Sequence, residues 1–138
     1  MKSYVLKEHA GPLAEYPHMR EANGFLFVSG VSARKPDGSV EGVVLQPTGR
    51  KFRDIKLQTK AVIENIREIL KAAGADLENL VEITTYLTHI EDYAAYNEVY
   101  NGYFKAETGP ARTTVAVSHL PGPDLLIEMQ AVAVKPTK

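Results

Sequence analysis

The chain contains no cysteine, and this absence removes several kinds of chemistry at once. Disulfides, thiolate nucleophiles and cysteine-based zinc sites are all excluded. No apolar run approaches the roughly 18–20 residues that span a bilayer, and the opening MKSYVLKEHA has no signal-peptide core. A net charge of −1 gives no general attraction to nucleic acid or to anionic membranes. We therefore expect a cytoplasmic protein that binds neither nucleic acid nor a membrane.

The composition is that of an ordinary globular protein, with 44% hydrophobic and 24% charged residues. The length fits one domain over residues 1–138, and no repeat or linker interrupts it. Strand-like segments are rich in Val, Ile, Thr, Tyr and Phe and are separated by Gly, Pro or Asp. They lie at 3–9, 24–32, 41–45 (the weakest), 80–87, 111–118 and 125–134.

Two helices fit between these strands. The first runs from about Asp54, a candidate N-cap, to about Ala73, and Gly74 follows as a candidate C-cap. The second covers roughly 91–105 and carries aromatic residues at spacings of three and four. Such an aromatic stripe is far more often part of a core than a cofactor site.

This order predicts an α+β fold, a single mixed β-sheet of about six strands with two helices packed on one face. Two helices cover only one face of a sheet. The segments FLFV (25–28) and AVAV (131–134) are nevertheless apolar on both faces. An uncovered apolar face usually marks an interface, so we expect a closed homo-oligomer.

Glu128 is the one carboxylate in the apolar strand LLIEMQAVAV (125–134). The turn-forming HLPGPD before it predicts an antiparallel hairpin with 111–118. The apolar register would then make Arg112 a diagonal neighbour of Glu128, roughly 7–8 Å away at the backbone. The pair has two interpretations. It is either a surface salt bridge worth about 0–1 kcal/mol, or a functional pair, because partly desolvated charges at a subunit boundary are costly unless they serve a ligand or each other.

Several longer segments are together similar to the RidA (YjgF-like) family of small proteins that hydrolyse reactive enamines and imines. The matching segments are FLFVSG, QTKAVIENIREILKAAGADLENLVEITTYL, YNEVYNGYF, GPARTTVAV and IEMQAVAV, which cover nearly the whole chain. The resemblance implies a chorismate-mutase-like fold that assembles as a homotrimer. It also implies a central barrel, three clefts between subunits and no cofactor.

The resemblance also implies the site residues. Arg112 and Glu128 match the family's signature arginine and glutamate and would be catalytic. Arg112 would bind a substrate carboxylate through two parallel hydrogen bonds. Glu128 would orient or deprotonate the attacking water and pass a proton to the departing nitrogen. The substrate-binding positions are Tyr16, Ser29, Gly30, Asn97 and Thr114, the last replacing a cysteine found in many members.

Some segments depart from the common family pattern. Val31 stands where glutamine is common, EYPHMR (15–20) replaces the usual opening, and the connection 34–55 is longer than in ordinary members. These departures resemble the 2-aminomuconate deaminase branch, which acts in the catabolism of aromatic compounds. Its dicarboxylate substrate needs a second cation. We favour Arg34 over the other candidates, which are Arg20, Arg50, Lys51 and Arg53.

Three other functions remain open on the sequence. The first is a generalist RidA-type deaminase of 2-iminobutanoate and 2-aminoacrylate. The second is a regulatory trimer that binds small carboxylates without converting them, and the third, RNA cleavage, finds no basic groove. The four histidines lack metal-ligand spacing, so we expect no metal. His18 and His119 are expected in loops or at a rim.

Overall fold

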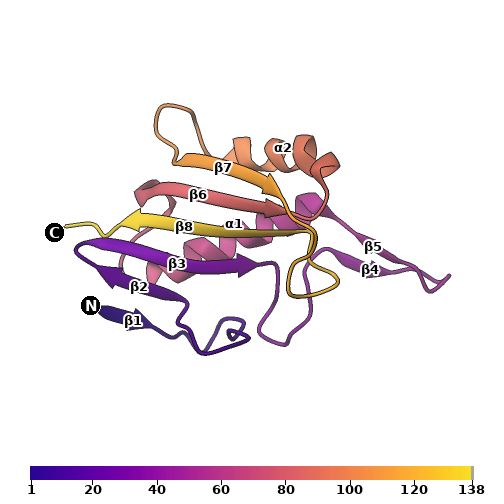
Figure 1. The fold of residues 1–138 in the computed structure, drawn as a ribbon, viewed down its shortest axis with the longest axis horizontal. Coiled ribbons are helices and arrows are strands. Elements are labelled where there is room, and N and C mark those ends of the chain that lie inside the picture. The colour runs from indigo at the N-terminus through magenta and orange to yellow at the C-terminus, as the bar shows by residue number, and fades with distance from the viewer. Residues whose placement is uncertain (138) are drawn as a thin grey trace.

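The computed structural model describes residues 1–137. Six strands form one mixed sheet in the spatial order β1-β2-β3-β8-β6-β7 (Figure 1). Their bounds are Lys2–Tyr4 (β1), Met19–Ala22 (β2), Phe25–Ser32 (β3), Leu80–Leu87 (β6), Ala111–Ala116 (β7) and Ile127–Val134 (β8). Two further strands, β4 (Val43–Leu45) and β5 (Lys51–Arg53), pair only with each other.

The two main helices are α1 (Ile55–Lys71) and α2 (Tyr93–Tyr103), and the 3-10 turns η1 (Leu77–Asn79) and η2 (Ile90–Asp92) flank β6. Helix α1 begins at the predicted cap, where the Asp54 carboxylate accepts hydrogen bonds from the backbone amides of Lys56 and Leu57. Gly74 follows its end with φ +76°, a backbone conformation that favours glycine. Both predicted helix ends are therefore confirmed.

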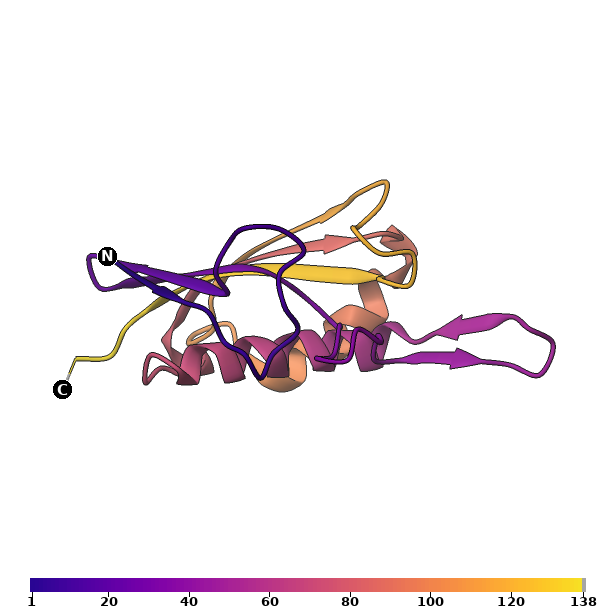
Figure 2. The same ribbon diagram turned by 90° about the horizontal axis from the view of Figure 1, so that it is seen from below.

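Both helices pack on the same face of the sheet (Figure 2). Every second residue of β8 is buried on that side, and this strand pattern meets the apolar stripe of α1. The core residues that meet there include Val62, Ile63, Ile66, Leu70, Ile127, Met129, Ala131 and Ala133. The predicted α+β architecture of one sheet and two helices is confirmed.

Over residues 1–137, no layer covers the opposite face of the sheet. Its apolar side chains Phe25, Phe27, Val115 and Val134 are between 40% and 46% exposed. Phe25 lies opposite Val134 across the β3–β8 ladder, so these side chains share one surface. The sequence had predicted this uncovered apolar face.

The predicted hairpin between 111–118 and 125–134 is wrong. Strand β6 lies between β7 and β8, parallel to the first and antiparallel to the second. Parallel neighbours need a long crossover, and α2 supplies it between β6 and β7. The turn-forming loop before β8 is therefore a longer connection that passes over the end of β6.

Several strands differ from the prediction. Strand β5 was not predicted, and β7 and β8 are each two residues shorter than the predicted segments 111–118 and 125–134. The strand expected at 3–9 ends at Tyr4, and β2 (Met19–Ala22) was not predicted, because its MREA sequence carries two charges and little β-propensity. The weak segment 41–45 is β4 of a two-stranded ribbon that projects beyond the sheet and the helices (Figure 2).

Candidate functional site

Glu128 lies near the start of β8 on the uncovered face of the sheet, opposite Ser32 of β3. Its side chain is half-buried, and this burial raises the pKa of the Glu128 carboxyl above its ordinary value. The positive charge of Arg34 acts more weakly in the other direction. A carboxyl that holds its proton more readily than a surface glutamate suits a group that must both accept and donate a proton.

Gly30 is the residue that lets the Glu128 carboxyl lie this close to β3. The β3–β8 register shifts between Val28 and Val31, which is the irregularity expected of a β-bulge. A Cβ atom on Gly30 would overlap Oε2 of Glu128 and would lie 3.0 Å from its Cδ. Any side chain here would therefore displace the carboxylate.

A cavity of about 340 Å³ opens beside the Glu128 carboxylate. It brings together five of the predicted site residues, namely Tyr16, Ser29, Gly30, Arg34 and Glu128. The sequence did not identify the other wall residues, which are Leu13, Ser32, Pro121 and Leu125. They lie in or next to loops whose path only the folded chain defines.

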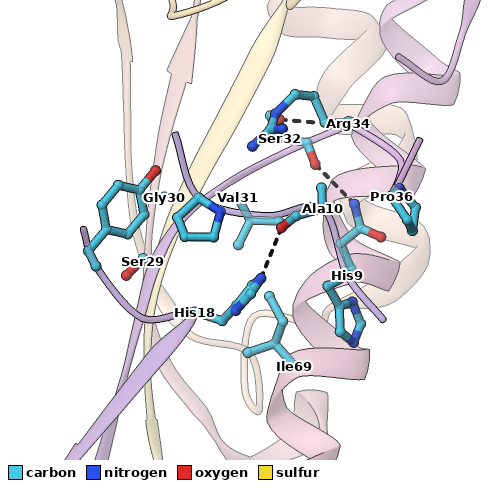
Figure 3. Close-up of a pocket in the computed structure, with 13 residues that line it drawn as sticks. His9, Ala10, His18, Ser29, Gly30, Val31, Ser32, Arg34, Pro36 and Ile69 are labelled. Atoms are coloured by element: carbon cyan, nitrogen blue, oxygen red, sulfur yellow. Dashed lines mark hydrogen bonds between the residues drawn. The ribbon is translucent and has the colours of Figure 1, made fainter. Parts of the chain in front are cut away.

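A smaller hollow of about 80 Å³ shares several of these residues and extends toward α1 (Figure 3). His18 lies on its wall, in the loop before β2, and is buried. Nδ1 of His18 accepts a hydrogen bond from the Leu6 amide at 3.1 Å, and its Nε2 lies 2.9 Å from the Ala10 carbonyl oxygen. His18 therefore fastens the amino-terminal segment. His119 is exposed in the loop after β7, as expected.

Two predicted site residues, Ser29 on β3 and Arg34 just after it, also hold the amino-terminal segment in place. Ser29 donates a hydrogen bond from Oγ to the Pro17 carbonyl at 2.7 Å. The Arg34 guanidinium donates to the Gly11 carbonyl, also at 2.7 Å. Tyr16 is left 43% exposed at the cavity.

Arg112 lies in a second cluster, on β7 and against α2. Its guanidinium donates to Oδ1 of Asn97 at 2.8 Å and to the Tyr93 hydroxyl at 2.9 Å. The guanidinium carbon also lies 4.7 Å from the centre of the Tyr100 ring and 5.1 Å from that of Tyr96. Arg112 and Asn97, both predicted site residues, are therefore in direct contact.

Thr114, two residues along β7, belongs to the same cluster. Its Oγ1 shares a hydrogen bond of 3.1 Å with the Tyr96 hydroxyl, which also donates to Oγ1 of Thr85 at 2.8 Å. Tyr96 and Tyr100 are buried, as expected for a core stripe. Their second role around Arg112 was not predicted, although the spacing of Tyr93, Tyr96 and Tyr100 already puts their rings on one side of the helix.

Within one chain the two clusters do not meet. Arg112 pairs with Ile83, whose side chain is buried beneath the helices, whereas Glu128 pairs with Tyr86 on the uncovered face. The two residues therefore lie on opposite faces of the sheet with β6 between their strands. The expectation that they are diagonal neighbours is wrong.

Among residues 1–137, no three His, Asp or Glu side chains are placed so that they could hold a metal ion. In that same part of the chain, no helix is both long enough and apolar enough to cross a membrane.

Comparison with known proteins identifies the class. Residues 7–135 match the family described as Endoribonuclease L-PSP. A RutC family protein of Pyrococcus abyssi is 44% identical over 136 residues, which cover 97% of this chain and 98% of the relative. The chain therefore belongs to this family, which is the RidA (YjgF) family.

The family includes a named deaminase. Reactive Intermediate Deaminase A of Arabidopsis thaliana chloroplasts is 34% identical over 136 residues, which cover 96% of this chain and 66% of the relative. Solved structures are similar over nearly the whole chain. Yeast Mmf1 has a TM-score of 0.82 at 27% identity, covering 98% of each chain. E. coli TdcF with bound serine has a TM-score of 0.79 at 27% identity, covering 99% of this chain and all of that one.

Proposed function

We propose that the protein hydrolyses the C=N bond of a carboxylate-bearing imine, formed by tautomerisation of an enamine, and releases ammonia. The observation that carries this proposal is the half-buried Glu128 carboxyl, which lies over Gly30 in a cavity of about 340 Å³ and has a raised pKa. The family's reactive intermediate deaminase supports the same reaction class.

The site is completed by a second copy of the chain. Arg112 lies on β7, which is an edge strand, so a neighbouring copy can reach it. Glu128 lies on the uncovered apolar face, which needs a partner. In a homotrimer, Arg112 and Asn97 of one copy would face Tyr16, Ser29 and Glu128 of the next.

Each residue has a defined part in the reaction. Arg112 holds the substrate carboxylate, and Asn97 and the tyrosine rings keep its guanidinium in place. Glu128 removes a proton from water as the water oxygen attacks the imine carbon. That proton passes to the imine nitrogen and gives the carbinolamine. Glu128 then takes the proton of the carbinolamine hydroxyl and delivers it to the amine nitrogen, so that the C=O bond forms as the C–N bond breaks and ammonia leaves. The imine carbon is already electrophilic, so no cofactor is needed.

For the substrate we propose 2-aminomuconate, which would give 4-oxalocrotonate and ammonia. This compound carries two carboxylates, and Arg34 supplies a second cation on the wall of the cavity that contains Glu128. One amino group of its guanidinium donates to Gly11, which leaves other donors for a ligand.

Two further functions have support of their own. The Arabidopsis relative is named for reactive intermediates in general, which favours a generalist deaminase. The TdcF structure contains serine, which favours a trimer that binds small carboxylates without converting them. Comparing turnover of 2-aminomuconate with that of imines from amino-acid oxidation separates the specialist from the generalist.

The decisive variant is Glu128→Gln, because an amide keeps the shape of the side chain but cannot accept the proton from water. We expect ammonia release to fall by at least about a hundredfold, in line with the loss of a general base. Glu68→Gln, an exposed residue of α1, is the control and should keep full activity. Unchanged ammonia release by Glu128→Gln would refute the hydrolytic role and favour simple binding.

A further inference from the structure

Residues 43–53 form a ribbon of two antiparallel strands, β4 and β5, that extends away from the rest of the chain (Figure 2). Its strands pair Val44 with Phe52 and Leu45 with Lys51. A tight turn closes the tip, where the Gln46 amide donates to the Arg50 carbonyl at 2.7 Å. The ribbon is therefore a defined structural element and not an irregular loop.

The base of the ribbon is fixed to the body by charged contacts. Arg53 donates to Oδ1 of Asp124 through Nη2 at 2.8 Å and through Nε at 3.1 Å. Lys51 reaches the same carboxylate at 3.0 Å. The Asp54 amide donates to the Gly42 carbonyl at 2.8 Å and closes the base. These contacts set the direction in which the ribbon projects.

The ribbon is apolar where it leaves the body. Val44 and Phe52 are each 53% exposed and lie side by side across the ladder, and Leu45 is 68% exposed. A two-stranded ribbon is at best marginally stable in water without a packing surface. Within residues 1–137, the sheet and the helices leave all three side chains exposed.

We infer that this ribbon packs on the body of a second copy of the chain. Arg50, Lys51 and Arg53 make the ribbon basic, with no acidic residue between 43 and 53. The whole chain has a net charge of −1, so the residues outside the ribbon carry a net charge of −4, and the ribbon keeps an excess of positive charge after Lys51 and Arg53 share the single carboxylate of Asp124. Two ribbons would repel each other, which favours a head-to-tail contact between ribbon and body. Such contacts form a closed ring when the rotation from one copy to the next closes, as in a trimer.

The position of the ribbon fits an interface beside the proposed site. Asp124, which holds its base, precedes Leu125, and Leu125 lines the cavity that contains Glu128. The contact with a second copy would therefore continue the boundary at which Arg112 and Glu128 are proposed to meet. The inference goes beyond imine hydrolysis and does not require it.

RNA is the other class of partner that a basic ribbon suggests. Lys51 and Arg53 are already paired with Asp124, so Arg50 alone is left for a phosphate. Exposed Val44, Leu45 and Phe52 suit a protein surface better than a polyanion. The contacts therefore favour a second copy.

The absence of cysteine allows a direct test by thiol labelling. In Val44→Cys, maleimide labelling at concentrations where the chain is oligomeric should be at least roughly tenfold slower than in Lys60→Cys, because a buried thiol reacts poorly. Lys60 is exposed on α1 and serves as the matched control. The two rates should become similar in denaturant. Equal rates in the native oligomer, or a chain that stays monomeric at all concentrations, would overturn the inference.

A second variant tests the contact by assembly. Val44→Ser with Phe52→Ser should keep the circular dichroism of the wild type, because both side chains are exposed within one copy. Its oligomer should dissociate at higher protein concentration than the wild type, as measured by light scattering. Unchanged dissociation would contradict the inference.

Two further measurements separate the remaining outcomes: labelling of Val44→Cys with and without single-stranded RNA, and ammonia release. If Val44→Cys were protected only after RNA is added, the ribbon would be a nucleic-acid site and the inference would be wrong. Ammonia release is measured on the same samples. Protection without hydrolysis would refute the proposed function alone, and hydrolysis by an oligomer with an unprotected ribbon would refute this inference alone.

Discussion

Arg112 and Glu128 face opposite sides of one sheet, with β6 between the strands that carry them. Each has its own surroundings. Arg112 lies among tyrosine rings beside α2, and Glu128 lies over Gly30 on the uncovered face. A reaction that uses both residues therefore needs two copies of the chain.

Mixing two inactive variants tests this requirement. Arg112→Ala and Glu128→Gln should each lose ammonia release when purified alone. After the two are unfolded together and reassembled, about a quarter of the sites in a cyclic trimer would combine an intact Arg112 with an intact Glu128. We therefore expect activity to return to about that fraction of wild type. Mixtures that stay inactive, although native mass spectrometry detects mixed trimers, would place both residues in one copy's site.

Gly30→Ala tests the close approach of β3 to Glu128. The added methyl group would overlap the carboxylate, so kcat should fall by at least about tenfold through misplacement of the Glu128 carboxyl. The control is Gly102→Ala in α2, where a Cβ meets nothing within 4 Å. It should leave activity unchanged and stabilise the helix slightly, because alanine has the higher helix propensity. A fully active Gly30→Ala variant would mean that the carboxylate does not act from this position.

The pH dependence of stability follows from the raised pKa of Glu128. Its ordinary value is 4.5, and burial moves the folded-state value upward. Between the two values the folded state binds more protons than the unfolded state, so this group lowers stability as pH rises through that window. Glu128→Gln should therefore lose less stability than the wild type over the same pH range in urea unfolding. If the free energies of unfolding of the wild type and of Glu128→Gln changed in parallel with pH, the raised pKa of Glu128 would be contradicted.

Removing the positive charge of Arg34 should shift the pH–rate profile. Its positive charge lowers the Glu128 pKa, so Arg34→Gln should move the acid limb of kcat/KM to higher pH. Arg20→Gln is the matched control, because Arg20 bonds to Ser3 at the edge of the sheet, and it should leave the limb in place. An unmoved limb in Arg34→Gln would mean that this charge does not act on the essential carboxyl.

Replacing Arg34 also tests whether its guanidinium binds the second carboxylate of the proposed substrate. Arg34→Ala should raise KM for the dicarboxylate 2-aminomuconate, because one charge-assisted contact is lost. KM for a monocarboxylate imine should change little, since Arg112 still binds its carboxylate. Equal increases for both substrates would refute the assignment and return Arg34 to its structural contact with Gly11.

Much of the fold was predictable because it depends on local signals. Asp54 and Gly74 mark the ends of the α1 region through capping and a positive φ, which act within a few residues. The alternation in β8 predicted which side chains are buried and singled out Glu128. Strands that are apolar on both sides, with only two helices to cover them, predicted the uncovered face of the sheet.

The site was predictable only in part. Tyr16, Ser29, Gly30, Arg34 and Glu128 were expected together and line one cavity. The walls formed by Leu13 and Pro121 were missed, because these loop residues carry no periodic pattern.

By itself the sequence determined where the two helices and most strands of the main sheet lie, which side of those strands is apolar, and that one carboxylate breaks the β8 pattern. Hydrogen bonding and side-chain periodicity along a segment are local, so they can be read from neighbouring residues. Only the tertiary structure decided that β6 separates β7 from β8, and with it that Arg112 and Glu128 lie apart. Several strand orders would satisfy the same alternation, and the crossover through α2 selects one of them by packing over long sequence distances.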